Sequence, residues 1–167
     1  VEETAEPSTD DPDKRELVTL EIEQLKTEFQ TIDIKSLVYS ARASIEQLLS
    51  IRNVSVDIQA PPEPVLVSTD PVVAKHVLIN LLSSAAQRSD ANTLRLHLRS
   101  TDDRTSLSLQ FTDETDGHDP LLNDITTEIL YRLKWEILQN CVQNSTHILE
   151  LSFGKNIPMV LVVDDFE

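Results

Sequence analysis

Residues 70–88 constrain the fold most, because their pattern predicts one long amphipathic helix. Asp70 can cap its N-terminus, and Pro71 suits the first helical position, where a missing N–H costs nothing. Four apolar side chains recur at helical spacing and predict the face turned to the core: Val73, Val77, Leu81 and Ala85. A neighbouring polar stripe of His76, Asn80 and Ser84 recurs every four residues, so one groove can contain all three side chains.

The rest of the chain alternates between helical and strand patterns. Amphipathic spacing predicts a second helix over 34–49, with Asp33 as its N-cap, and a third over 121–141. Alternating apolar residues predict strands at 54–58, 94–98, 107–111 and 149–153, and a short apolar run predicts a further strand at 65–67. TDDR turns the chain between the third and fourth strands into a hairpin. This order predicts an α+β fold: a two-layer α/β sandwich whose mixed, mainly antiparallel sheet carries the three helices on one face.

The two ends of the chain have a different composition. Residues 1–13 carry six acids and two prolines, which predicts an acidic disordered linker. Residues 14–31 predict a connecting helix with only a partial apolar stripe, so we expect its partner in another domain or chain. The domain itself is expected at 32–154. Because the chain begins at Val1 and stops in mid-pattern, we expect it to be part of a longer protein.

Charge and composition exclude several classes of function. The net charge of −15 argues against binding to nucleic acid or to an anionic membrane, because both depend on clustered Lys and Arg. No run reaches the roughly 18 apolar residues of a membrane span. The single cysteine, Cys141, excludes an internal disulfide and fits a reducing cytoplasm. None of the four histidines has the spacing of a zinc site.

The helix at 70–88 resembles the N-box helix of histidine-kinase catalytic domains, in the GHKL (HATPase) superfamily that also includes DNA gyrase B. That family typically reads D…(R)QVLxNLLxNAxKY. Five positions match here: Asp70, Asn80, Leu81, Leu82 and Ala85. The second Asn of the pattern is Ser84 in this chain, and its Lys is Gln87. The resemblance spans about 17–153 and implies a Bergerat-type sandwich that binds Mg-ATP in active members.

A second resemblance follows the strand that ends at Phe111. The stretch TDETDGHDP is similar to the family's adenine-binding box, DxGxGI, in which the Asp accepts a hydrogen bond from the adenine amino group. Asp113 matches this Asp and Gly117 the second Gly, whereas Thr115 replaces the first Gly. A β-branched residue lacks the backbone freedom that glycine gives for close approach to a ligand.

The contacts to phosphate and metal that the family implies are also altered. The second N-box Asn ligates Mg²⁺ in the family, and the shorter Ser84 hydroxyl can reach such an ion at best through a water. Residues 119–131 contain no glycine, and they place Asp119, Asp124 and Glu128 where the family's second glycine box receives phosphates. We therefore expect no catalytic residue, no bound cofactor and a vestigial nucleotide site of Asn80, Ser84, Asp113 and Gly117.

On the sequence alone, these residues can also have purely structural roles. Asn80 can be a solvated or capping side chain, Ser84 a small residue that permits close packing, and Asp113 an ordinary turn acid after a strand. Tyr131 and Trp135, on the predicted third helix, are expected in the core or at an interface.

The C-terminal stretch GKNIPMVLVVDDFE resembles the first strand of a response-regulator receiver domain. We expect residues 155–167 to be a linker and the truncated first strand. In the family the acid pair after this strand, here Asp164 and Asp165, helps to bind Mg²⁺ beside the phosphorylated Asp. That role needs the rest of the receiver, and we expect it only in the full protein.

Three functions remain in view. The leading one is a signalling module of a hybrid two-component sensor: a degenerate histidine-kinase-like ATPase domain that regulates an attached receiver. The second is an active catalytic domain that binds Mg-ATP and transfers phosphate to a histidine outside this chain. The third is a non-enzymatic interaction or dimerisation domain. We expect a cytoplasmic protein, a receiver in the same polypeptide, a homodimer in the full protein, and no nucleic acid or membrane partner for this part.

Overall fold

The computed structural model describes residues 27–90, 92–113 and 121–155. The helices are α2 (Ile34–Ser44), α3 (Glu46–Arg52), α4 (Pro71–Arg88) and α5 (Asp124–Arg132). The strands are β1 (Gln30–Asp33), β2 (Ser55–Gln59), β3 (Leu66–Thr69), β4 (Thr93–Ser100), β5 (Arg104–Thr112), β6 (Glu136–Gln143) and β7 (Thr146–Lys155).

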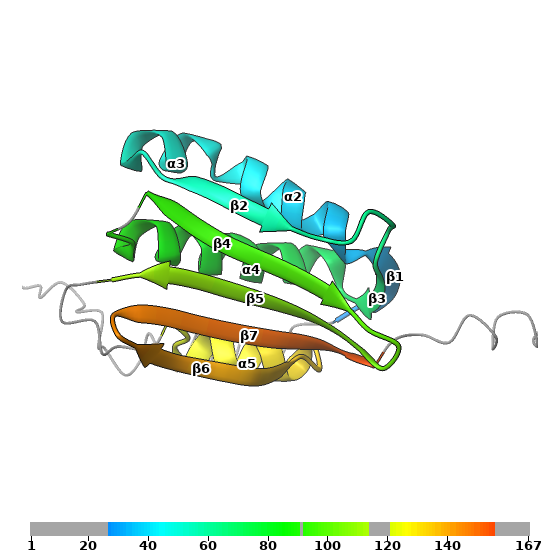
Figure 1. The fold of residues 1–167 in the computed structure, drawn as a ribbon. Helices are drawn as coiled ribbons and strands as arrows, with labels where there is room; N and C mark the ends of the chain where they lie inside the picture. Colours follow the sequence, from blue (N-terminus) through cyan, green and yellow to red (C-terminus); the bar gives the residue numbers. More distant parts are fainter. Residues whose placement is uncertain (1–26, 91, 114–120, 156–167) are drawn as a thin grey trace, which may run out of the picture.

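One five-stranded sheet forms the first layer and the helices form the second. The strand order is β2-β4-β5-β7-β6, in which β2 and β4 are parallel and every other neighbouring pair is antiparallel. Figure 1 shows α2, α3, α4 and α5 on the same face of this sheet. Strands β1 and β3 form a small antiparallel sheet of their own beside it. The predicted α+β sandwich, with a mainly antiparallel sheet and helices on one face, is confirmed.

Helix α4 forms as its sequence predicts. The carboxylate of Asp70 accepts hydrogen bonds from the N–H groups of Val72 and Val73 and so caps the first turn, and Pro71 is the first helical residue. The Asp70 Oδ2 atom also accepts the Glu28 N–H at 2.8 Å, which ties the entering chain to this helix. The core lies between α4 and the sheet, where eight leucines meet: Leu78, Leu81, Leu82, Leu96, Leu107, Leu109, Leu149 and Leu151.

The predicted helix at 34–49 is two helices. Asp33 caps α2 as expected, but Ile45 leaves helical geometry, with φ −109° and ψ 17°, and α3 begins at Glu46. The apolar stripe continues across this break, because Ile34, Ile45 and Leu49 are all buried. Periodicity therefore predicted the buried face correctly, whereas the interruption carries no Gly or Pro signal that could have revealed it.

The predicted helix at 121–141 is wrong beyond its first half. Helix α5 ends at Arg132, Lys134 adopts a left-handed φ of 63°, and residues 136–143 form strand β6 instead. Strand β6 pairs with β7 through a turn at Asn144 and Ser145, both with positive φ, as in a type I′ hairpin. Leu133 and Ile137 follow the helical spacing, but pairing with β7 places Ile137 in a strand instead.

The connecting helix predicted over 14–31 is also wrong at its end. Residues 27–29 are irregular, and Gln30–Asp33 form β1, which pairs with β3. This pairing satisfies backbone groups that a helix would have bonded internally. The remainder of that prediction, together with the linker at 1–13 and the strand within 155–167, lies outside the described residues, apart from Lys155 at the end of β7.

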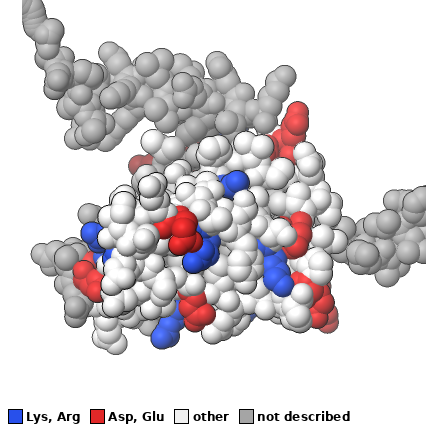
Figure 2. Space-filling view, turned by 90° about the horizontal axis from the view of Figure 1, so that it is seen from above, with Lys and Arg blue, Asp and Glu red and all other residues white. Residues whose placement is uncertain are grey.

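The described surface carries both signs of charge. On the face shown in Figure 2, Asp and Glu side chains are interspersed with Lys and Arg, and no patch of one sign stands out among the described residues. Within the described ranges, no helix is long and apolar enough to cross a bilayer.

Candidate functional site

The polar stripe of α4 runs toward the end of strand β5. Asn80 is exposed and Ser84 is half-buried, and Arg88, one further turn along, ends the helix. Positions 80, 84 and 88 follow one side of the helix, with about 6 Å of rise between neighbours. The stripe therefore continues beyond the two predicted N-box residues to an arginine at the end of the helix.

Arg88 reaches the residue that matches the family's adenine-binding Asp. Its Nε donates to Oδ2 of Asp113 at 3.3 Å, and the Asp113 side chain is only 3% exposed. His147 Nε2 lies 3.6 Å from the same oxygen and 3.5 Å from an Nη atom of Arg88. The Asp113 carboxylate is thus held inside the protein by a guanidinium and lies beside an imidazole.

Phe111 completes this arrangement. Its ring stacks on His147, with centroids 4.7 Å apart and 9° between the planes, and the Arg88 guanidinium carbon lies 5.8 Å from the Phe111 centroid. The Asp113 backbone N–H also donates to the Ser145 carbonyl at 2.8 Å. We call Arg88, Phe111, Asp113 and His147 the Asp113 cluster. It joins the end of α4 to strands β5 and β7.

The N-terminus of α5 is already capped by the chain itself. The Asn123 side chain accepts the Thr126 N–H at 2.7 Å, and its backbone carbonyl accepts the Thr127 hydroxyl at 2.9 Å. Asp124 stands in the first turn, where a negative charge interacts favourably with the helix dipole. The N-cap is thus the amide side chain of Asn123, and Asp124 occupies the favourable position for an anion.

The structure describes only part of the predicted site. Asn80 and Ser84 lie on α4, and Arg88 at the end of this helix contacts Asp113, whereas Gly117, Asp164 and Asp165 lie outside the described residues. Sequence reasoning missed Arg88 and His147 as partners of Asp113. Two signals were present: Arg88 continues the four-residue stripe, and His147 continues the inward alternation of Leu149 and Leu151.

No sequence profile of a known protein family matches this chain, and no curated protein matches its sequence. Solved structures do match its fold. The histidine kinase AdeS of Acinetobacter baumannii is similar over 87% of this chain and 76% of its own, with 24% identity and a TM-score of 0.69. The catalytic domain of histidine kinase ThkA is similar over 77% of this chain and 96% of its own, with 15% identity and a TM-score of 0.64.

A mycobacterial sensor histidine kinase, MprB, gives the same picture: 80% of this chain matches all of that chain, with 11% identity and a TM-score of 0.59. At these identities the likeness concerns the fold. The described part of this chain has the fold of histidine kinase catalytic domains, the ATPase domains of two-component signalling proteins.

Proposed function

We propose that this chain is the signalling module of a hybrid two-component sensor, a histidine-kinase-like ATPase domain that has lost nucleotide binding and regulates an attached receiver domain. One observation carries the loss of binding. The Asp113 carboxylate, which would receive the adenine amino group, already accepts a hydrogen bond from Arg88 and lies beside His147.

Mg-ATP fits these residues poorly. The Asp113 carboxylate is only 3% exposed, and a neutral adenine N–H would have to compete there with a charged guanidinium donor on Oδ2. Charge-assisted hydrogen bonds are roughly twice as strong as neutral ones. Ser84 offers a short hydroxyl in place of the amide oxygen that the family uses on Mg²⁺. At α5 the Thr126 N–H is committed to Asn123, and Asp124 adds a negative charge where a phosphate would need a positive field.

The signalling role is supported by neighbours in the same fold. One similar structure is ThkA in complex with a response regulator protein, which matches 93% of this chain with a TM-score of 0.67. In this chain the acid pair Asp164 and Asp165 follows an apolar run, the pattern of a receiver's first strand. We infer that a receiver follows in the same polypeptide and that the full protein is a homodimer.

Binding of Mg-ATP tests the proposal directly. Isothermal calorimetry and thermal unfolding of the full chain should give no heat and no change in Tm with Mg-ATP. A ligand at a hundred times its Kd would raise the stability by about 2.7 kcal/mol, which is easily seen. ShkA, solved in complex with AMPPNP, serves as the positive control.

A micromolar or tighter Kd would overturn the proposed loss and favour an active kinase domain. In that case Asp113→Asn should weaken binding most, because the carboxylate would then be the adenine anchor. The receiver is tested separately, by extending the chain downstream by roughly 120 residues, a typical domain length. The longer protein should form an acyl phosphate with a small phosphodonor, and failure to do so contradicts the hybrid architecture.

A further inference from the structure

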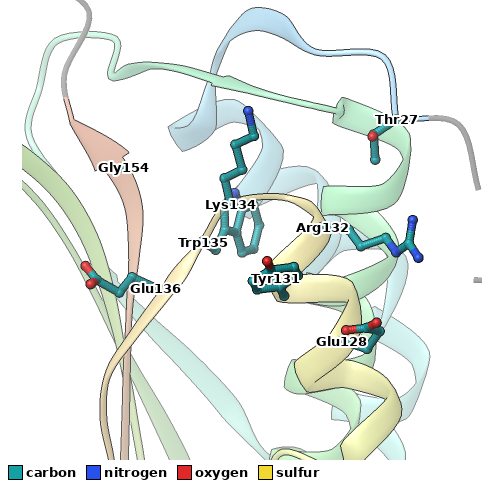
Figure 3. A pocket seen from close by; sticks show the side chains of 8 residues that line it. All are labelled: Thr27, Glu128, Tyr131, Arg132, Lys134, Trp135, Glu136 and Gly154. Atoms are coloured by element: carbon teal, nitrogen blue, oxygen red, sulfur yellow. The ribbon is translucent and has the colours of Figure 1, made fainter. Parts of the chain in front are cut away.

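A groove of about 740 Å³ lies away from the Asp113 cluster, between the end of α5, the start of β6 and the end of β7. Figure 3 shows Arg132 and Lys134 extending from the end of α5 in different directions, with Thr27 across the opening. Trp135 lines the groove beneath them, and Gly154 belongs to its wall. The groove therefore lies where the chain enters the described domain.

The wall of the groove contains a donor without an acceptor. The Trp135 side chain is 5% exposed and packs edge-on against Phe153, with ring centroids 4.7 Å apart. Its indole Nε1–H is buried and has no hydrogen-bond partner among the residues that the structure describes. A buried N–H without a partner is costly, so proteins rarely keep one unless another group supplies the acceptor.

Lys134 occupies a position at which the backbone favours glycine. Helix α5 ends in a Schellman motif: Trp135 N–H donates to the Leu130 carbonyl at 2.9 Å and Lys134 N–H to the Tyr131 carbonyl at 3.0 Å. Lys134 is the left-handed residue of this motif, with φ 63°. Such strain in a residue other than glycine is typical of functional positions, and here it brings an ammonium group to the groove.

The charges of the groove select a particular kind of partner. Glu136 lies 3.7 Å from the Arg104 guanidinium and is thereby balanced. Three more charged side chains line the wall: Arg132, Lys134 and Glu128. Exposed Tyr131 adds apolar surface. A partner with both acids and a base, and with apolar side chains, fits this wall better than a small anion does.

We propose that the groove binds residues 20–26 of the same chain, LEIEQLK, which directly precede its rim residue Thr27. This segment carries two acids, one lysine and three apolar residues: Leu20, Ile22 and Leu25. The chain is fixed at the rim, because Glu28 is held by Asp70 and the Phe29 ring lies 5.6 Å from the Lys134 ammonium. The groove then supplies the partner that the partial apolar stripe of the connecting helix lacks.

The dimensions agree with this occupant. A helix about 10 Å wide with a pitch of 5.4 Å fills roughly 420 Å³ per turn, so the groove accepts between one and two turns, about six residues. The last carbonyls of a helix have no partners within the helix and carry a partial negative charge. These carbonyls are the acceptors that the Trp135 indole N–H and the Lys134 ammonium can bind.

The single tryptophan of the chain gives a direct test by NMR. In the ¹⁵N-labelled full chain, the one indole N–H peak should shift by more than its line width in Leu20→Asp/Leu25→Asp. Ala5→Asp/Thr9→Asp adds the same two acids farther from the domain and should leave the peak in place. Unchanged amide peaks of α4 verify that the domain stays folded. An indole peak that does not respond to the first pair overturns the proposal.

The reverse experiment substitutes a residue of the groove wall and measures the amide peaks of residues 20–26. Lys134→Gly should shift the amide peaks of residues 20–26, and it cannot be dismissed as unfolding because glycine relieves the backbone strain. Arg42→Gln, which removes an exposed cation elsewhere, should leave these peaks unmoved. If the amide peaks of residues 20–26 do not shift in Lys134→Gly, the proposal is wrong. A response that vanishes on dilution also overturns it, because the groove would then bind the segment of a second copy.

Discussion

Replacement of Arg88 by methionine removes the guanidinium that holds the Asp113 carboxylate and keeps an apolar stem of similar length. The carboxylate stays buried, at 3% exposure, with its charge no longer balanced by Arg88. Loss of one partner of a buried ion pair is strongly destabilising, because it leaves a charge that the interior solvates poorly. We therefore expect a large loss of stability from a substitution at the end of a helix.

The magnitude follows from the geometry. At 3.3 Å and an effective dielectric constant near 20, the attraction is 332/(20 × 3.3), or about 5 kcal/mol. Breaking a buried pair costs about 3–5 kcal/mol. Arg88 keeps 24% of its side chain exposed, and His147 remains near the carboxylate, so the lower end applies. The expected decrease in the free energy of unfolding is about 3 kcal/mol.

Urea unfolding at pH 7, followed by Trp135 fluorescence, measures this change, with Arg42→Met as the matched control. Arg42 lies closer to its partner Glu46, at 2.8 Å, but the two side chains are 33% and 61% exposed. An exposed pair four residues apart on a helix contributes only about 0.3–0.5 kcal/mol. If burial rather than distance decides, the Arg88 variant loses several times more stability than the control.

A second substitution tests the same ion pair. Adding Asp113→Asn to the Arg88→Met variant should restore part of the loss, because an amide carries no charge to compensate. A loss in Arg88→Met no larger than that of the control would refute the view that this ion pair holds the Asp113 cluster together.

Three other predictions concern stability. Asp70→Ala should lower the free energy of unfolding by about 2 kcal/mol in urea, because it removes the cap of α4 and the acceptor for Glu28, whereas exposed Asp102→Ala should stay within about 0.5 kcal/mol. Burial raises the pKa of Asp33, but hydrogen bonds from the Val65 N–H, the Ser36 hydroxyl and neighbouring backbone N–H groups outweigh it, and the net pKa lies below 3.8. The stability that Asp33 contributes is therefore fully present above pH 3.8 and is lost as the pH falls through the pKa of the folded state. The free energies of unfolding of Asp33→Asn and of the wild type should differ at neutral pH and converge in acid, below that pKa. Ser145→Gly should raise Tm, with a gain of about 0.5–1 kcal/mol, because glycine suits the second left-handed position of the β6–β7 turn; an unchanged or lower Tm would contradict the turn assignment.

The elements that could be predicted are those in which several local signals agree. For α4 the cap, the proline, the apolar face and the length all indicate one helix, and its bounds were predicted within a residue. For β4 and β5 two alternating runs flank a polar turn, which is sufficient to predict a hairpin. In both cases the pattern within the segment determines the structure, with little help from distant residues.

The boundary between α5 and β6 could not be predicted, because contacts with other parts of the fold determine it rather than a local sequence pattern. The α5 helix ends at a lysine in a left-handed conformation, a position where glycine would have marked the end. Strand β6 lies at the edge of the sheet, and nearly all of its residues are exposed, so it shows no alternation to indicate a strand. Pairing with β7 decides its structure, and no local pattern reports such pairing.

The candidate site divides in the same way. Sequence similarity located Asp113, but the groups around it come from positions 25 residues earlier and 34 residues later, which only the fold brings together. The contacts of Arg88 and His147 then give Asp113 a structural role, because they join α4 to β5 and β7. Both contacts use Oδ2 of Asp113, and its side chain is only 3% exposed, so an adenine amino group could reach this carboxylate only if the Asp113 cluster opened. Opening the cluster would remove the ion pair between Arg88 and Asp113, so under the proposed loss of nucleotide binding Asp113 still has a structural role in the domain.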